Sequence, residues 1–250
     1  NDSGTSNTIF GKTAGDSDGA GDFNVFVGEL SGGTGTQTDA CDFNVAVGYN
    51  AYTNVTQGTN STIVGAMAGD ASTTTTNLTL IGKGAGTAIN STSANGTTAL
   101  GSTALEALTG GEKNTAIGFN SASALLLGNR NTAIGYDSLN ALAGDDANNG
   151  GSDNIAIGVD AMGSLNAGVH NDARANSNIA IGNSAFLAGS MADSGASVSQ
   201  GNVAIGHEAI MSTGVTPHVG TTAVGFRALK NLTSGTGNLA IGFQSLDATG

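Results

Sequence analysis

Clustered aspartates are the residues of this sequence whose type and spacing come nearest to chemistry. Two segments rich in Gly and Ser or Asn carry three each: Asp16, Asp18 and Asp22 in the first, and Asp145, Asp146 and Asp153 in the second. Carboxylates in such loops are the hard oxygen ligands that calcium takes. Neither segment matches the helix-flanked calcium loop or the glycine-rich calcium nonapeptide. Calcium is therefore one interpretation and solvated acidic turns are the other, and no further cofactor is expected.

Other reactive side chains form no recognisable arrangement. The three histidines, His170, His207 and His218, fall in different phases of the repeat described below, so we expect them on the surface. Serine is abundant, but no histidine accompanies one in a catalytic setting. Cys41 is alone and is expected to be a small buried filler. The sequence therefore predicts that the chain is not an enzyme.

Composition excludes several classes of partner. The 250 residues include 41 Gly and only 4% aromatics, and the net charge is −12 with seven Lys and Arg. Nucleic-acid binding needs a basic footprint, as does docking on an anionic membrane. No apolar run approaches the length of a spanning helix, so membrane insertion is not expected either. The acidic balance, rich in Thr, Ser, Asn and Gly, favours an extracellular setting, on a cell surface or a virion.

A short motif, Asn-x-Ala-Ile-Gly followed three residues later by Ala or Ser, repeats along the whole chain. Successive motif glycines are most often 17 residues apart, and three consecutive spacings are longer, at 23, 24 and 24. The thirteen motif glycines are Gly11, Gly28, Gly48, Gly65, Gly82, Gly101, Gly118, Gly135, Gly158, Gly182, Gly206, Gly225 and Gly242. Internal repeats of this kind are typical of solenoids.

The motif predicts an all-β chain folded as a parallel β-solenoid, or β-roll, of about 13 turns. Val, Ile and Thr flank one small residue and glycine ends the run, which is a strand pattern. Seventeen residues are too few for two packed helices. We expect a single solenoid domain over 1–250, with thinner, Gly-rich turns in 1–100 and loop-bearing turns in 136–206. The three long insertions, about 144–153, 168–177 and 189–200, are expected to emerge at one corner.

Each motif position has an expected structural role. The glycine takes a backbone conformation that other residues avoid, or lets neighbouring backbone come close. The asparagines stack into a hydrogen-bonded amide ladder, and the isoleucines before the glycines stack into one buried column. The predicted core ladder consists of Asn114, Asn131, Asn154, Asn178, Asn202, Ile117, Ile134, Ile157, Ile181 and Ile205.

Aromatic residues often come directly after the motif glycine. The expected surface row is Phe119, Tyr136, Phe226 and Phe243, with Phe119 beside Tyr136 and Phe226 beside Phe243 on adjacent turns. An exposed aromatic row packs against a neighbouring chain or holds sugar rings. Packing against a chain is the favoured interpretation.

The motif resembles two groups of repeat proteins. One is the head repeats of trimeric autotransporter adhesins, and the other is the Asn-Thr-Ala-Ile-Gly-Tyr-x-Ala/Ser-Leu repeats of phage tail-fibre-like proteins. Residues 131–139 and 221–229 match the second closely. The resemblance implies left-handed parallel β-rolls in a homotrimer and a fibre or adhesive surface rod, with no catalytic residues. The base period of 17 departs from the shorter adhesin repeat.

Together these patterns predict a structural fibre, filament or shaft whose main partner is a copy of itself. Copies are expected to associate laterally as a trimer, as the resemblance implies, head to tail as a filament, or both. Head-to-tail association is expected because no capping segment flanks the first and last motifs. The competing interpretation of these uncapped ends is that the 250 residues are an excerpt from a longer fibre. The alternative is an adhesive rod that binds cell-surface glycan. Ice binding through flat Thr rows is less favoured, because the position of Thr115 and Thr132 is Ile155 and Ile179 further on.

Overall fold

The structure is a computed structural model that describes residues 5–16, 21–33, 37–38, 40–140, 151–164, 174–187, 198–211, 218–233 and 235–247. Within these residues the chain is all-β with one 3-10 turn, η1 (Thr92–Ala94). The strands stack in parallel, turn upon turn, so the predicted β-solenoid is confirmed. The chain divides into two compact units, Asn1–Phe119 (unit 1) and Asn120–Gly250 (unit 2).

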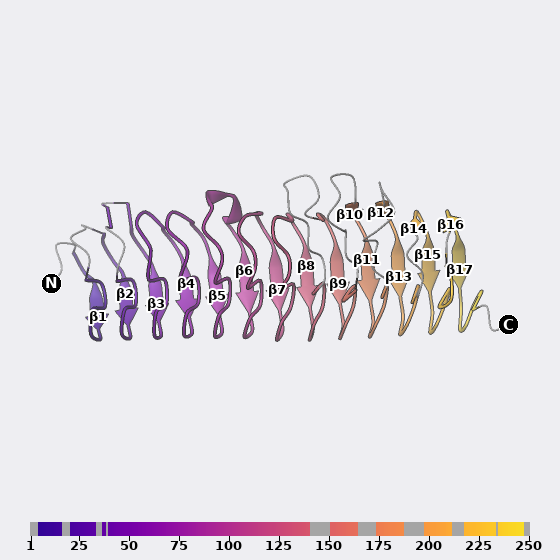
Figure 1. Cartoon of the computed structure of the whole chain (residues 1–250), viewed down its shortest axis with the longest axis horizontal. Coiled ribbons are helices and arrows are strands. Elements are labelled where there is room, and N and C mark those ends of the chain that lie inside the picture. Colours follow the sequence, from indigo (N-terminus) through magenta and orange to yellow (C-terminus); the bar gives the residue numbers. More distant parts are fainter. Residues whose placement is uncertain are drawn as a thin grey trace. The chain divides into compact units, whose positions relative to one another are not determined.

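In unit 1, each strand pairs in parallel with the strand one turn on (Figure 1). Every strand ends directly before a motif glycine, as the sequence predicted. The strands are β1 (Thr8–Phe10), β2 (Val25–Val27), β3 (Val45–Val47), β4 (Thr62–Val64), β5 (Thr79–Ile81), β6 (Thr98–Leu100) and β7 (Thr115–Ile117).

Unit 2 has two parallel sheets. The first continues the motif strands: β8 (Thr132–Ile134), β9 (Ile155–Ile157), β11 (Ile179–Ile181), β13 (Val203–Ile205), β15 (Thr222–Val224) and β17 (Leu239–Ile241). The second sheet was not predicted: β10 (Arg174–Asn176), β12 (Val198–Gln200), β14 (His218–Val219) and β16 (Gly235–Thr236). Its strands end two residues before Asn178, Asn202, Thr221 and Asn238, and β10 and β12 follow long insertions.

The motif glycine meets both expectations for it. Its φ lies between 125° and 149° in all thirteen copies, a region that L side chains rarely adopt. Successive glycines also touch: a Cβ added to Gly65 would lie 2.4 Å from the carbonyl oxygen of Gly82, and one on Gly158 would lie 2.4 Å from that of Gly182. Glycine is therefore required here both for its backbone conformation and for the close approach of the next turn.

The interior of the roll is filled by a pair of positions, the middle strand residue and the residue four after the motif glycine. In unit 2 the pair is a small residue and a large one: Ala133 with Leu139, Ala156 with Met162, Ala180 with Phe186, Ala204 with Ile210, and Ala223 with Leu229. These ten side chains are at most 2% exposed.

In four turns of unit 1 the order is reversed. Ile9, Phe26, Ile63 and Leu80 stand on the strands, and Gly15, Gly32, Gly69 and Gly86 follow. A Cβ on Gly32 would lie 2.6 Å from the Phe26 ring, so the phenylalanine already occupies that space. Glycine therefore stands at the later position in these turns because the large strand side chain already fills the interior. The backbone is the same in both cases, because φ at this position lies between 51° and 59° for these glycines and for the larger residues.

Candidate functional site

The outward face of the motif strands forms a regular surface in each of the two units. Strand side chains alternate, so the middle residue points into the roll and its two neighbours point out. Ala180 and Ala204 are fully buried, whereas Ile181 and Ile205 are 38% and 36% exposed. Ile117, Ile134 and Ile157 are intermediate. The predicted burial of this isoleucine column is wrong. Alanine and isoleucine are both apolar, and the smaller one fits the narrow interior.

The isoleucines nevertheless form the predicted column, on the outside. In unit 2 the pairing places Ile157 beside Ile181 and Ile181 beside Ile205. A second outward row runs parallel to it through Ile155, Ile179 and Val203. We call these six residues the isoleucine face. It carries no charged residue.

In unit 1 the corresponding face has a different composition. Thr62, Thr79, Thr98 and Thr115 stand side by side on β4–β7. A row of Val64, Ile81, Leu100 and Ile117 accompanies them on the same side of the sheet. We call the four threonines the threonine row. The sequence prediction compared Thr115 with later turns only, and it therefore did not include the three earlier threonines of this row.

The asparagine ladder is present. The side chain of Asn154 donates to Asn131 Oδ1 at 3.0 Å, Asn178 donates to Asn154 Oδ1 at 3.1 Å, and Asn202 donates to Asn178 Oδ1 at 2.9 Å. Each Oδ1 also accepts the backbone N–H of the next ladder residue. All four are buried, as is Asn114, whose side chain donates to Gly111 O at 3.1 Å. Its role is structural, since this ladder joins successive turns.

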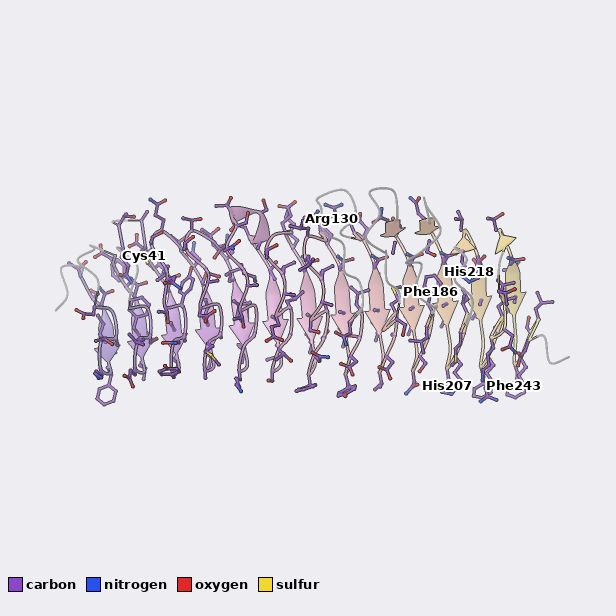
Figure 2. All side chains as sticks on the ribbon, in the orientation of Figure 1. Cys41, Arg130, Phe186, His207, His218 and Phe243 are labelled. Atoms are coloured by element: carbon purple, nitrogen blue, oxygen red, sulfur yellow. The ribbon has the colours of Figure 1, made fainter. Side chains whose placement is uncertain are left out.

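The exposed aromatics stand at the edge where the strands turn. Phe119, Tyr136, Phe226 and Phe243 are 54%, 51%, 37% and 73% exposed. Phe226 and Phe243 stack with their centroids 5.2 Å apart, as predicted, and His207 stacks on Phe226 at 5.4 Å. Figure 2 shows His207 and Phe243 at this edge. Because the Phe226 ring is stacked on both His207 and Phe243, its faces are covered and mainly its edge is open to a ligand.

A small ionic cluster lies beside the stacked rings. Arg227 and Lys230 bond to Glu208 Oε2 at 2.6 and 2.7 Å, and the Arg227 guanidinium lies 4.9 Å from the centre of the Phe226 ring. The hydrogen bonds from Lys230 and Arg227 lower the pKa of Glu208. These charges satisfy one another, so the cluster is an internal clamp between turns.

The calcium candidates are only partly within the described residues, which exclude Asp18, Asp145 and Asp146. Asp22 accepts the Thr5 N–H at 2.6 Å, which lowers its pKa, and Asp153 is paired with Arg130, which lowers the pKa of that carboxyl. Asp16 is exposed. In the described part of the chain no three His, Cys, Asp or Glu residues gather as a metal site would require.

Two candidate reactive residues are buried. Cys41 is fully buried as predicted, and burial raises the pKa of its thiol to about 12, so it is unreactive at neutral pH. His218 is also fully buried, which contradicts its predicted surface position. His207 is 42% exposed in its side chain, and His170 lies outside the described residues.

Most of the three long insertions lies outside the described residues. Their described ends include β10 and β12, which pair with each other in register. The second and third insertions therefore rejoin the roll at the same corner.

Comparison with known proteins identifies no relative: no family model matches the chain, and no curated protein matches it. No helix among the described residues is long and apolar enough to span a bilayer.

Proposed function

We propose that this chain is a structural segment of an extracellular fibre or shaft, and that it associates laterally with copies of itself through the isoleucine face. In this proposal the chain is not an enzyme. Its described interior is filled by packed side chains, and its candidate reactive groups are dispersed, paired or buried. The tail-fibre and adhesin repeats that the motif resembles support the same assignment.

The observation that carries this proposal is the exposure of an uncharged apolar face on a strongly acidic chain. Ile155, Ile181 and Ile205 are 36%, 38% and 36% exposed on adjacent strands. Contiguous apolar surface of this kind marks interaction sites. Copies with a net charge of −12 repel one another, so they can approach only where charge is absent.

A second copy is the partner that best fits this face. The rows repeat at the strand spacing of about 4.8 Å, and another copy presents rows with the same repeat. Side chains from two such faces interdigitate as in packed sheets. Head-to-tail association into filaments stays a prediction of the repeat pattern.

Sedimentation velocity tests the proposal. We expect the protein to be a discrete oligomer at micromolar concentration, and the double variant Ile181→Glu/Ile205→Glu to be monomeric with an unchanged circular dichroism spectrum. Gln200→Glu, an exposed change on β12 in the other sheet, is the matched control and should leave the oligomer intact. A monomeric parent protein at high concentration would contradict the proposal.

The threonine row favours a second candidate function, ice binding. Its hydroxyl and methyl groups repeat at about 4.8 Å on a rigid sheet, close to the repeat of oxygen atoms on ice. The apolar row from Val64 to Ile117 lies beside the threonines, and ice would displace little bound water from it. Thermal hysteresis measured on the parent and on Thr79→Lys/Thr98→Lys tests this. Absence of hysteresis in a parent protein shown to be monomeric would exclude it, whereas a laterally associated parent would support the first proposal.

Glycan binding by the aromatic row is the weaker alternative. Sugar rings stack on open aromatic faces, and the His207, Phe226 and Phe243 rings cover one another. A glycan array probed with the parent and with Phe243→Ala distinguishes this alternative from both proposals above.

A further inference from the structure

His218 occupies a position that is otherwise reserved for small side chains. It lies three residues before the ladder position of its turn. The same position in the other described turns is held by Gly21, Cys41, Gly58, Thr75, Ala94, Gly111, Gly128, Gly151, Ala175, Ser199 and Gly235. An imidazole is therefore the single bulky exception in this series.

Side chains at this position are small because neighbouring atoms leave little space around it. A Cβ on Gly58 would lie 1.8 Å from the Tyr52 hydroxyl, and one on Gly21 would lie 2.2 Å from the Cys41 carbonyl oxygen. His218 fits because the neighbouring strands β12 and β16 present Ser199 and Gly235 beside it. Its ring packs 6.2 Å from that of Phe186 and is fully buried.

Hydrogen bonds hold the backbone of His218 but not its ring. Its carbonyl oxygen accepts from the Asn202 side chain at 2.7 Å, and its N–H donates to Ser199 Oγ at 3.3 Å. Among the described residues neither ring nitrogen has a partner, and the same is true of Thr221 Oγ1 and Asn238 Nδ2 nearby. Thr221 takes the place of a ladder asparagine, so the ladder is interrupted at this turn.

Charge is also missing from the surroundings of the ring in the described part of unit 2. Phe186, Ser199, Asn202 and Gly235 are all uncharged. The titratable groups His207, Glu208, Arg227 and Lys230 of the neighbouring motif turns are partly exposed and engaged with one another. Figure 2 shows His207 at the opposite edge from His218. Burial alone lowers the pKa of His218.

We propose that the turn containing His218 is an acid-sensitive joint of unit 2. When the ring takes up a proton, both of its nitrogens become donors inside an uncharged, fully packed interior. An uncompensated charge there is costly, so the ring leaves the interior and the pairing of β14 with β12 and β16 opens. Because the small-residue series leaves no other large side chain at this position, opening is confined to this part of the roll.

Acid should favour the open state of the joint, because His218 binds a proton more readily when its ring is outside the interior. The open state has a histidine of ordinary pKa, 6.5, and the closed state one of lower pKa. The open state therefore binds more protons once the pH falls below 6.5. The closed joint is most favoured above that pH, and its opening equilibrium rises by up to about tenfold for each pH unit until the closed-state pKa is passed.

Two measurements on the whole chain test the joint. In hydrogen exchange corrected for intrinsic rates, amides of β14 and β16 should lose protection between pH 6.5 and pH 4.5, while β3 and β4 of unit 1 stay protected. His218→Ser, which restores the residue type of Ser199, should abolish the loss, and His207→Gln, an exposed control, should preserve it.

An NMR titration of the His218 ring in the parent protein does not depend on any variant folding. It should titrate below its ordinary value, in step with the loss of protection. A ring that titrates at the ordinary value, or a His218→Ser protein that loses protection at the same pH as the parent, would overturn the proposal.

Discussion

Unit 2 and four turns of unit 1 fill their interiors by opposite routes. Those turns of unit 1 put the large side chain on the strand and glycine four residues after the motif glycine, as in Phe26 and Gly32. Turns of unit 2 put alanine on the strand and the large side chain in the later position, as in Ala180 and Phe186. Since the backbone has the same φ in both, the fold accepts the large side chain at either of the two positions. Copies of the repeat can therefore differ in sequence at both positions and still keep the same backbone.

The largest effect should come from disturbing one half of such a pair. Phe26→Ala should cost about 3–5 kcal/mol because it leaves a cavity. Gly32→Leu should also be strongly destabilising, because its Cβ would lie 2.6 Å from the Phe26 ring. The double variant Phe26→Ala/Gly32→Leu copies the arrangement of unit 2 and should recover most of the loss. Urea unfolding of the four proteins as a double-mutant cycle measures the coupling, and additive losses would contradict the pairing.

Substitution of the motif glycine should destabilise both units by the same amount. Gly65→Ala and Gly158→Ala should each cost about 2–4 kcal/mol, from backbone strain and from contact with the next turn. Thermal unfolding monitored by circular dichroism checks both variants against Gly201→Ala, whose added Cβ would have nothing within 4 Å. A tolerated substitution in either unit would show that turns there are more loosely stacked than described.

Breaking the ladder should cost more stability in unit 2 than in unit 1, and this effect should be smaller than those above. It is continuous from Asn131 to Asn202 in unit 2, whereas in unit 1 it passes from Asn44 to Ser61 and is interrupted at Leu78. Asn154→Ala removes several buried hydrogen bonds and should cost about 1–3 kcal/mol. Ser61→Ala, with fewer bonds, should cost less. Chemical denaturation compares them, and equal costs would argue against a ladder.

The smallest effect should come from the ion pair of Arg130 and Asp153. Both side chains are about half exposed, so Arg130→Gln should cost less than about 1 kcal/mol. Pairing lowers the pKa of Asp153. The contribution is therefore present above the ordinary aspartate pKa and disappears as the pH falls through the lowered value. Comparing the stability of parent and variant at pH 7 and pH 3 checks this, and a difference that is no smaller at the lower pH would contradict it.

The repeat made the strands and the glycines predictable, because each recurs at one place in every copy and has one physical explanation. The ladder was predictable wherever asparagine recurs before the strand. It did not settle which strand residue points inward. Ala180 and Ile181 are both apolar, and period-two alternation is compatible with either orientation. The narrowness of the roll, which decides the matter, is a property of stacked turns. The second sheet and the burial of His218 were missed because both lie in the segments that precede the motif strands, whose residues the motif does not describe.

The turn-to-turn contacts have a consequence for how such a chain changes length over generations. Turns meet their neighbours through a recurring set of groups: a glycine carbonyl, three strand residues and, where the ladder is unbroken, a ladder amide. Removing or duplicating one whole repeat restores every one of these contacts between new neighbours. Deleting a single residue within a strand instead exchanges its inner and outer side chains. Recombination between copies of the repeat in the gene is thus a structurally silent change, and length can drift freely while the sequence of each strand stays in phase.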